Sequence, residues 1–475
     1  MPPNIARIVF AIGVAGLFLL DRDKEARTSR ALWLPVFWLL INASRPVSMW
    51  LTSESVTQMQ NPDQYLEGNP LDRFVYSALL LSGLVVLIMR MTRLSKLLQR
   101  NLPIVLFFVY GALSVLWSDY TEVSFKRWIK ALGDLVMILI VLTDFDPYAA
   151  LKRLVSRVGF ILIPASVLLI KYFPALGRTY NIWTWEPQYV GVADHKNTLG
   201  MICMVFGLGF VWRFMMAYRD RQDERRTKRL VTYGVLLAMV VWLLLTANST
   251  TSLACFVLGA ALLLVTTIRR VTRTPALVTL VVASLLFCVV FALLLDSGGG
   301  LVGALGKDPT LTGRTDIWKL VLSMNNNPVL GTGFESFWLG ERAQRIWSMY
   351  YFHPTQAHNG YIEVYLELGW LGIFLLVAII VAGYRNALST FAANQDAGRI
   401  RIAYIAIGLV YNVTEAGFRM TAPTWFFFLL SAVVAPAVAV EAAPTSLAVD
   451  SSGEIKKWRS EHDSVSASRR RIEAV

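Results

Sequence analysis

The chain has 475 residues, of which 55% are hydrophobic and 16% charged, and 45 Lys and Arg against 32 Asp and Glu give it a formal net charge of +13. A soluble chain of this size carries about 25% charged residues. Here the apolar excess comes in runs such as 230–247 and 276–295, close to the roughly 20 residues that cross a bilayer core about 30 Å thick. The sequence therefore predicts an all-α polytopic membrane protein. It excludes a soluble enzyme, a secreted disulfide scaffold and an outer-membrane barrel, whose strands alternate apolar and polar residues.

In chain order, the apolar runs predict about 12 to 13 transmembrane helices. The runs occupy 4–20, 31–51, 73–90, 102–117, 127–143, 154–173, 198–217, 230–247, 251–268, 275–295, 361–384, 400–416 and 422–440. Residues 4–20 resemble the core of a signal peptide, but no small-residue cleavage site precedes Asp21, so we expect an uncleaved first span.

These runs divide the chain into four parts. They are N-terminal transmembrane helices over 1–295 (about ten spans), a long, partly helical loop over 296–360, C-terminal transmembrane helices over 361–440, and a tail over 441–475. The tail is charged, rich in Ser and poor in apolar residues, so we expect it to be disordered.

The connectors that follow the first, third, seventh, ninth and eleventh runs are rich in Lys and Arg, and the positive-inside rule puts such connectors in the cytoplasm. Every basic connector then falls on one side of the membrane. The connectors 174–197 and 296–360 face outward, as does the N-terminus, and the C-terminus lies inside. Because the positive charge is spread over loops that set orientation, it does not predict a nucleic-acid partner.

The outward loop 296–360 is about 65 residues long, far more than a helix hairpin needs. Its many aromatic residues favour an ordered loop packed at the membrane interface. The segment from Thr312 to Trp318 predicts a helix start, which puts Arg314 at the helix N-terminus, where backbone N–H groups and a guanidinium suit phosphate oxygens. The alternative is an interfacial arginine that contacts lipid headgroups or pairs with Asp316.

A second polar cluster stands where this loop enters the run 361–384. His358 there can serve as a base near neutral pH or as a hydrogen-bond donor to a phosphate. The alternative is that Asn359 only caps the helix and His358 is its solvated neighbour. His353 lies five residues before His358 with no third ligand at metal spacing, so we expect no metal site.

A third cluster lies in the outward connector before the run 198–217. Lys171, Arg178 and Lys196 bring three cations to this stretch, with His195 beside Lys196, and so indicate an anionic ligand. Arg45 interrupts an apolar run, and an intramembrane arginine is a functional candidate by default, with snorkelling to the outer face as the alternative.

Four motifs in this order then resemble the O-antigen ligase and polymerase family of bacterial envelope glycan enzymes. They are Gly313-Arg314-Thr315-Asp316-Ile317-Trp318, Asn327-Pro328-Val329-Leu330-Gly331-Thr332-Gly333-Phe334, Ala357-His358-Asn359-Gly360-Tyr361-Ile362-Glu363 and Glu367-Leu368-Gly369-Trp370-Leu371-Gly372. The N-terminal segments Ser44-Arg45-Pro46 and Gly68-Asn69-Pro70-Leu71-Asp72 are similar to the exopolysaccharide polymerase branch.

This resemblance implies a metal-independent glycosyltransferase of the bacterial inner membrane, with its active site facing the periplasm and no cofactor. Its donor would be an undecaprenyl-diphosphate-linked oligosaccharide, and its acceptor hydroxyl would belong to a glycan or lipid-linked glycan. Polymerisation is favoured over ligation to lipid A core. Membrane lipids, a chain-length regulator and export proteins are the further expected partners.

The resemblance also implies that Arg314 and His358 are the catalytic pair. The expected substrate-binding residues for diphosphate and sugar are Arg178, Lys196, His195, Asn359, Arg45, Trp318 and Tyr361. A flippase or transporter for the same lipid-linked sugar is the alternative from another class. It is disfavoured because Asp134 is the chief ionisable residue in the middle of a predicted span, whereas charges gather at the outer surface.

Overall fold

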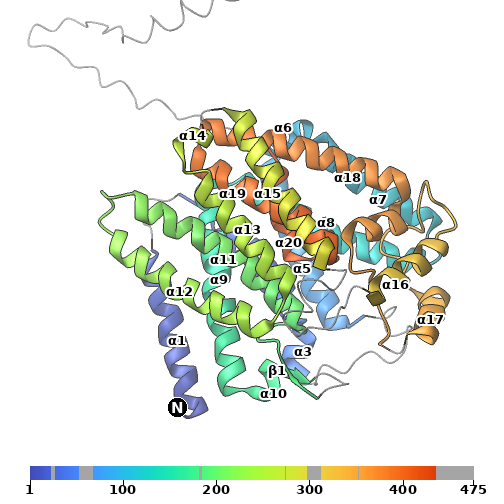
Figure 1. Cartoon of the computed structure of the whole chain (residues 1–475), viewed down its shortest axis with the longest axis horizontal. Helices are drawn as coiled ribbons and strands as arrows, with labels where there is room; N and C mark the ends of the chain where they lie inside the picture. The colour runs from blue at the N-terminus through green and yellow to red at the C-terminus, as the bar shows by residue number, and fades with distance from the viewer. Residues whose placement is uncertain are drawn as a thin grey trace, which may run out of the picture. The chain divides into compact units, whose positions relative to one another are not determined.

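The computed structural model of the chain describes residues 1–22, 27–52, 68–180, 185–272, 274–296, 312–350 and 352–434, which form a helical bundle (Figure 1). The predicted disordered tail 441–475, the end of the predicted last span and the start of the long loop lie outside the described residues. The disorder of the tail therefore stays a prediction.

The helices follow the predicted runs closely. The N-terminal elements are α1 (Pro3–Leu20), η1 (Arg30–Leu32), α2 (Trp33–Asn42), α3 (Val47–Thr52), α5 (Pro70–Met89), α6 (Met91–Arg100), α7 (Leu102–Ser114), η2 (Val115–Trp117), α8 (Thr121–Leu142), α9 (Pro147–Tyr172) and α10 (Pro174–Gly177). A short antiparallel hairpin of β1 (Arg178–Tyr180) and β2 (Pro187–Tyr189) follows, in which Arg178 pairs with Tyr189.

The remaining helices build the rest of the bundle around α11, which packs against α9, α12, α13 and α19. They are α11 (Lys196–Arg219), α12 (Arg226–Ala247), α13 (Thr250–Val265), α14 (Arg269–Thr272), α15 (Pro275–Asp296), α16 (Thr312–Ser323), α17 (Gly340–Met349), α18 (Gly360–Ala393), α19 (Gln395–Thr414) and α20 (Pro423–Ala432). The helices α16 and α17 lie in the loop predicted over 296–360, which is thus partly helical (Figure 1).

Among the described residues, 6 helices are long and apolar enough to cross a membrane, namely α1, α5, α9, α11, α12 and α18. A seventh candidate is α6 with Leu102–Trp117, a pair bent by 92°. The fold class is thus confirmed as an all-α polytopic membrane protein. Each predicted run contains a helix, but several of these helices are shorter or carry more charges than the six, so the total of about 12 to 13 spans stays a prediction.

Two segments differ from the prediction. The run 31–51 is not one helix, because α2 ends before Ser44 and α3 begins only after Pro46, which lacks the backbone N–H that a continuous helix would use. The basic connector after the third run is helical as α6. Its Leu94, Leu97 and Leu98 fall at helical spacing and pack on the core, and this burial stabilises the helix.

The basic connectors meet at one end of the bundle. They are joined there by Arg213 Nη2 to Asp21 Oδ1 at 2.8 Å, Arg219 Nη1 to Asp396 Oδ1 at 3.1 Å, Arg90 Nη2 to Asp144 Oδ2 at 3.8 Å, and Arg399 Nε to the carbonyl oxygen of Thr266 at 3.1 Å. The structure therefore groups these connectors as the positive-inside pattern predicts.

The long loop is fastened to α18 where that helix breaks. Gly369 has φ 63° and ψ −162°, so the helix is interrupted there. The freed N–H groups of Trp370 and Leu371 donate to the carbonyl oxygens of Pro328 and Val329, at 2.9 and 3.2 Å. In return, the N–H groups at 332 and 333 donate to the carbonyl oxygens at 366 and 367, at 3.0 and 2.9 Å. We call these paired segments, 328–333 and 366–371, the loop clasp.

Two glycines of the loop clasp, Gly331 and Gly369, are required by close approach. A Cβ added at Gly369 would lie 2.2 Å from the carbonyl oxygen of Val329, and one at Gly331 would lie 2.4 Å from the backbone of Glu367. Two of the four motifs are therefore used to dock the loop on the bundle.

Candidate active site

Side chains from the starts of three helices converge on Glu415, the residue that ends α19. The Glu415 Oε1 atom accepts from Asn197 Nδ2 at 3.2 Å and from Arg314 Nη2 at 3.4 Å, and Oε2 lies 3.2 Å from His358 Nδ1. Asn197 is the second residue of α11, Arg314 the third of α16, and His358 directly precedes the Asn359 cap of α18. We call these four residues the Glu415 cluster.

The position of His358 is fixed by its neighbours in the chain. Ala357 donates its N–H to Glu363 and accepts at its carbonyl oxygen from Trp318 Nε1 at 2.7 Å. These contacts hold His358 with φ 51°, a left-handed conformation that costs a non-glycine residue about 1–3 kcal/mol. Such strain is typical of a side chain whose direction matters.

Asn359 on the other side of His358 is the N-cap of α18. Its Oδ1 accepts from the N–H groups of Tyr361 and Ile362 at 3.0 and 3.1 Å, and its Nδ2 donates to the carbonyl oxygen of Val413 at 3.0 Å. Gly360 permits this contact between α18 and α19, because a Cβ there would lie 1.8 Å from Asn412 Oδ1. Asn359 therefore ties His358 to the segment that carries Glu415.

Arg314 lies in the first turn of α16, as predicted. Its Nη1 donates to the carbonyl oxygen of Thr414, and its side chain keeps 22% of its surface exposed, against 9% for Glu415. The guanidinium thus has one side on the end of α19 and another side open to a ligand.

Charge explains how a buried carboxylate is tolerated. Burial would raise the pKa of Glu415, but the hydrogen bond with His358 and the charges of His358, Arg314 and His195 outweigh it and hold the pKa below its usual 4.5. The N-termini of α11, α16 and α18 adjoin this cluster, and the positive ends of their dipoles also favour the ionised carboxylate. Glu415 is therefore ionised, and it favours the His358 tautomer with the proton on Nδ1 and an acceptor at Nε2.

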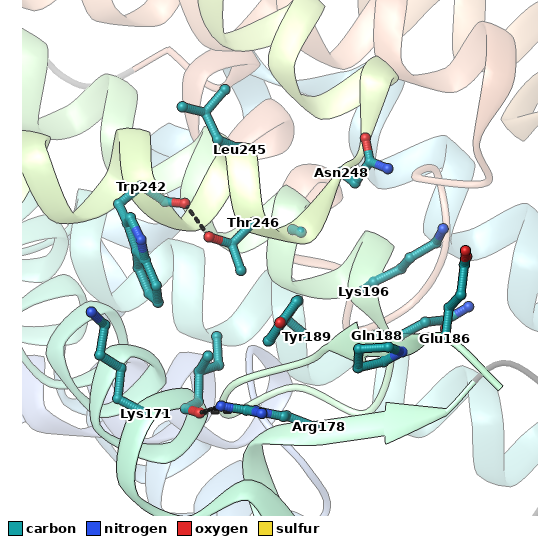
Figure 2. A pocket seen from close by; sticks show the side chains of 13 residues that line it. Lys171, Arg178, Glu186, Gln188, Tyr189, Lys196, Trp242, Leu245, Thr246 and Asn248 are labelled. Carbon is teal, nitrogen blue, oxygen red and sulfur yellow. Dashed lines mark hydrogen bonds between the residues drawn. The ribbon is translucent and has the colours of Figure 1, made fainter. Parts of the chain in front are cut away.

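A second feature, the α9–α12 cavity, opens on the other side of the α11 N-terminus (Figure 2). Its volume is about 860 Å³, and Lys171, Arg178 and Lys196 bring three cations to its lining. The other lining residues are Ile170, Glu186, Pro187, Gln188, Tyr189, Trp242, Leu245, Thr246, Ala247 and Asn248. The predicted clustering of cations in this connector is thus present, around a space large enough for a ligand.

The cations of this cavity are held at different places. Arg178 donates from Nε and Nη2 to the carbonyl oxygen of Ile170 at 3.1 and 3.0 Å, with its guanidinium 5.3 Å from the Tyr189 ring centre. Lys171 Nζ lies 4.9 Å from the ring centre of Trp242. Lys196 is the first residue of α11 and adjoins Asn197, so the cavity and the Glu415 cluster share one helix start.

The other predicted binding residues are engaged in the protein fold. Arg45 is 5% exposed and donates from Nε to the carbonyl oxygen of Ala193 at 3.0 Å and from Nη2 to those of Leu176 and Gly191. His195 caps α11 by accepting the Asn197 N–H at 3.2 Å. Arg45 and His195 thus brace the hairpin and the helix start that border the cavity.

Two predicted aromatic contacts also have protein partners. Trp318 donates to Ala357, and Tyr361 donates from its hydroxyl to the carbonyl oxygen of Leu409 at 3.0 Å. Their roles in sugar binding stay predictions. Among the described residues, no group of three or more His, Cys, Asp or Glu side chains lies close enough to hold a metal ion.

Sequence reasoning missed Glu415 and its neighbour Asn197. The available signal was a carboxylate at the end of the predicted run 400–416, in Val413-Thr414-Glu415-Ala416-Gly417. A lone glutamate at such a place is usually solvated, and only the fold brings it to within 3.2 Å of a histidine 57 positions earlier.

The family model described as O-antigen ligase matches residues 234–377, a segment that contains Arg314 and His358. The exopolysaccharide production protein ExoQ of Rhizobium meliloti is 26% identical over 295 residues, which are 59% of this chain and 64% of the relative.

Two Rickettsia proteins whose names give them provisionally as polysaccharide ligases are also similar. The one from Rickettsia prowazekii is 25% identical over 217 residues and the one from Rickettsia typhi 24% over 221, each covering 44% of this chain and 53% of the relative. Each match thus spans less than two thirds of the relative's own length. Together, the family match over residues 234–377 and these relatives show that this polytopic membrane protein is similar to proteins of the O-antigen ligase family.

Proposed function

We propose that the protein is a glycosyltransferase that polymerises oligosaccharide units in exopolysaccharide or O-antigen biosynthesis. The donor is an undecaprenyl-diphosphate-linked oligosaccharide, the acceptor is a hydroxyl of a second glycan, and the reaction takes place on the periplasmic side of the bacterial inner membrane. The observation that carries the proposal is the Glu415 cluster, an arginine and a histidine joined by one carboxylate, beside a cavity lined by three cations.

In this reaction His358 is the general base. Glu415 accepts at Oε2 from Nδ1, which leaves Nε2 to take the proton of the acceptor hydroxyl, and no described residue bonds to Nε2. The acceptor oxygen then forms a bond to the anomeric carbon while the bond from that carbon to the phosphate oxygen breaks. Ionised Glu415 stabilises the imidazolium that results, as the carboxylate does in other His-carboxylate pairs.

The cations stabilise the leaving group. Undecaprenyl diphosphate departs with its charge increased, and Arg314, Arg178 and Lys196 neutralise that charge where it develops. A diphosphate ester supplies the energy of the transfer, so the reaction needs neither a nucleotide nor a metal. Arg314 lies near the reacting centre at which His358 acts, because both side chains contact Glu415.

Polymerisation is favoured over ligation to lipid A core because the longest match is to an exopolysaccharide production protein. Ligation is the second candidate, supported by the names of the two Rickettsia relatives. A transport path through the bundle has less support. Asp134 is the chief ionisable residue in the middle of a predicted span. It accepts hydrogen bonds from Trp38 Nε1 and from the Thr421 N–H, both at 2.7 Å, so both its oxygens are engaged within the fold.

The direct test is reconstitution of the purified chain in proteoliposomes with a purified undecaprenyl-diphosphate oligosaccharide, in the presence of a chelator. Gel electrophoresis of the products should show a ladder of extended chains. Transfer to added lipid A core in place of a ladder would establish the ligase. The absence of both products would overturn the proposal of a glycosyltransferase.

The Arg314→Ala variant tests the site in the same assay. We expect it to lose about 10²-fold or more in rate, because a charge-stabilising donor is removed from the leaving group. Arg345→Ala is the matched control, since Arg345 is an exposed arginine of α17 in the same loop. Full activity in Arg314→Ala would overturn the assignment of the site while leaving the reaction standing.

A further inference from the structure

We propose that the α9–α12 cavity fixes the direction of the lipid-linked donor and contains a subsite for its first sugar. The sugar lies at the end formed by Glu186, Gln188 and Asn248, and the polyprenyl chain leaves past Trp242 and Leu245. This inference rests on the proposed function, which it extends to the recognition of the donor.

The size of the cavity calls for more than a diphosphate. Pockets of about 300–1,000 Å³ enclose whole organic ligands of drug size, and this one has about 860 Å³. It therefore has room for a diphosphate together with at least one sugar ring. Two aromatic faces, Tyr189 and Trp242, line it as well, and such faces pack against the C–H surface of sugars or against an alkyl chain.

The two ends of the cavity differ in chemistry. Figure 2 shows Lys171 and Trp242 on one side, Glu186, Lys196 and Asn248 on the other, and Arg178 between them. At this end the Glu186 carboxylate repels a diphosphate and offsets the charge of Lys196, so the Glu186 end suits a neutral polyol (Figure 2). Carboxylate oxygens accept hydrogen bonds from sugar hydroxyls, and the amides of Gln188 and Asn248 can both donate and accept.

The apolar end opens toward the lipid. Leu245 is 64% exposed on α12, one of the helices long enough to cross a membrane, and Trp242 lies about one turn before it. A polyprenyl chain can therefore enter between the helices there. Lys171 beside the Trp242 ring then meets the phosphate nearest the lipid, and Arg178 meets the centre of the diphosphate.

The polar end adjoins the reacting groups. Lys196 lines the cavity at the start of α11, and the next residue, Asn197, donates to Glu415 at 3.2 Å. A donor that enters with its lipid past Trp242 brings its sugar toward this helix start, and thus toward His358. The reverse direction would put the diphosphate against Glu186 and the anomeric carbon far from the base.

The test uses the full chain in nanodiscs and measures equilibrium binding of four lipids. They are undecaprenyl diphosphate and the same lipid carrying one glucose, one galactose or one N-acetylglucosamine. We expect at least one glycosylated lipid to bind wild type about tenfold more tightly than the bare lipid, because a few new hydrogen bonds to a charged group supply that gain.

The variants separate the two ends of the cavity. Glu186→Ala should remove the gain from the sugar and leave bare undecaprenyl diphosphate unchanged, and Glu186→Gln should keep part of the gain. Trp242→Ala should weaken all four lipids by a common factor. Glu224→Ala, an exposed glutamate in the connector between α11 and α12, should change none, and thermal unfolding should show that each variant is folded.

Three results would overturn the inference. Glycosylated lipids that bind no more tightly than the bare lipid, or Glu186→Ala weakening bare and glycosylated lipids equally, would remove the sugar subsite while leaving the proposed transferase intact. No binding of any of the four lipids to the wild-type chain would count against the proposed function itself, and the subsite would fall with it.

Discussion

His358 and Glu415 face one another where the start of α18 meets the end of α19, with Nδ1 3.2 Å from Oε2. The other oxygen of the same carboxylate, Oε1, accepts hydrogen bonds from Arg314 and Asn197. A single side chain thus determines both the tautomer of the proposed base and the place of the arginine beside it. The predictions below test this relationship and the scaffold that produces it.

Replacing Glu415 by Gln should lower the turnover number about 10²- to 10⁴-fold, because the imidazolium formed during proton transfer loses its negative partner. The ascending limb of the pH–rate profile should move to lower pH for the same reason. The measurement is the rate of chain extension between pH 5 and 9, with Glu341→Gln on α17 as the control. An unchanged profile would mean that Glu415 only supports the fold.

The stability of the protein should depend on Glu415 in acid. Burial opposes ionisation of this carboxyl, but its hydrogen bond with His358 and the nearby positive charges hold its pKa below the usual 4.5. A group whose pKa is depressed by folding stabilises the protein above the unfolded-state value, and this contribution is lost as the pH falls through the folded-state pKa.

The unfolding temperature of the wild-type chain in detergent should therefore exceed that of Glu415→Gln at pH 7, and the gap should close as the pH is lowered from about 4.5 toward 3. The control is the same titration on Glu341→Gln, which should parallel the wild type. A gap that stays constant across this range would contradict ionisation of Glu415.

His358→Gln should reduce chain extension by about 10²- to 10⁴-fold and abolish the ascending limb of the pH profile, because Gln keeps a donor but cannot accept a proton near neutral pH. Full activity with a flat profile would show that His358 is not a base. His353→Gln is the control. His353 stacks on Trp347 with ring centres 4.6 Å apart, away from the contacts to Glu415.

Arg178→Ala should lower kcat/KM for the donor about 10- to 150-fold, because Arg178 is proposed to contact the diphosphate both in the bound donor and as it departs. The size of the effect follows from the contribution of a hydrogen bond to a charged group, about 1.5–3 kcal/mol. Steady-state kinetics with varied donor give kcat/KM. Lys228→Ala, an exposed cation in the first turn of α12, should behave like the wild type.

Gly369→Ala should destabilise the chain by about 1–3 kcal/mol from its left-handed backbone alone, and further because the new Cβ would press on Val329. Thermal unfolding in detergent measures the loss. Gly16→Ala in α1 is the control, since no atom lies within 4 Å of its added Cβ. Equal stability of the two variants would show that the loop clasp is not required.

Periodicity and charge were sufficient to predict the helices, because apolar runs bury their surface in lipid or in one another whatever their neighbours are. The helix start at Thr312 and its Arg314 could be predicted from local turn and spacing signals. The break at Gly369 could not. It depends on contacts with the loop segment 328–333, about 40 residues earlier. A glycine in a helical pattern gives no sign of that partner segment.

The site was predictable in part for the same reason. Arg314, His358 and the cations around Arg178 were visible because their residue types are costly near a membrane. Glu415 escaped notice because its importance comes from tertiary proximity to residues that precede it by tens or hundreds of positions. Asn359 was predicted to bind substrate, with capping as the alternative, and the structure shows the capping contacts.

The Glu415 cluster is completed late in the synthesis of the chain. Asn197, Arg314 and His358 are all synthesised before Glu415, which emerges only with the end of α19. Until that helix is threaded into the membrane, the histidine has no carboxylate and the loop has only part of its anchorage. A nascent or truncated chain that lacks the end of α19 therefore holds His358 without the carboxylate that contacts its Nδ1.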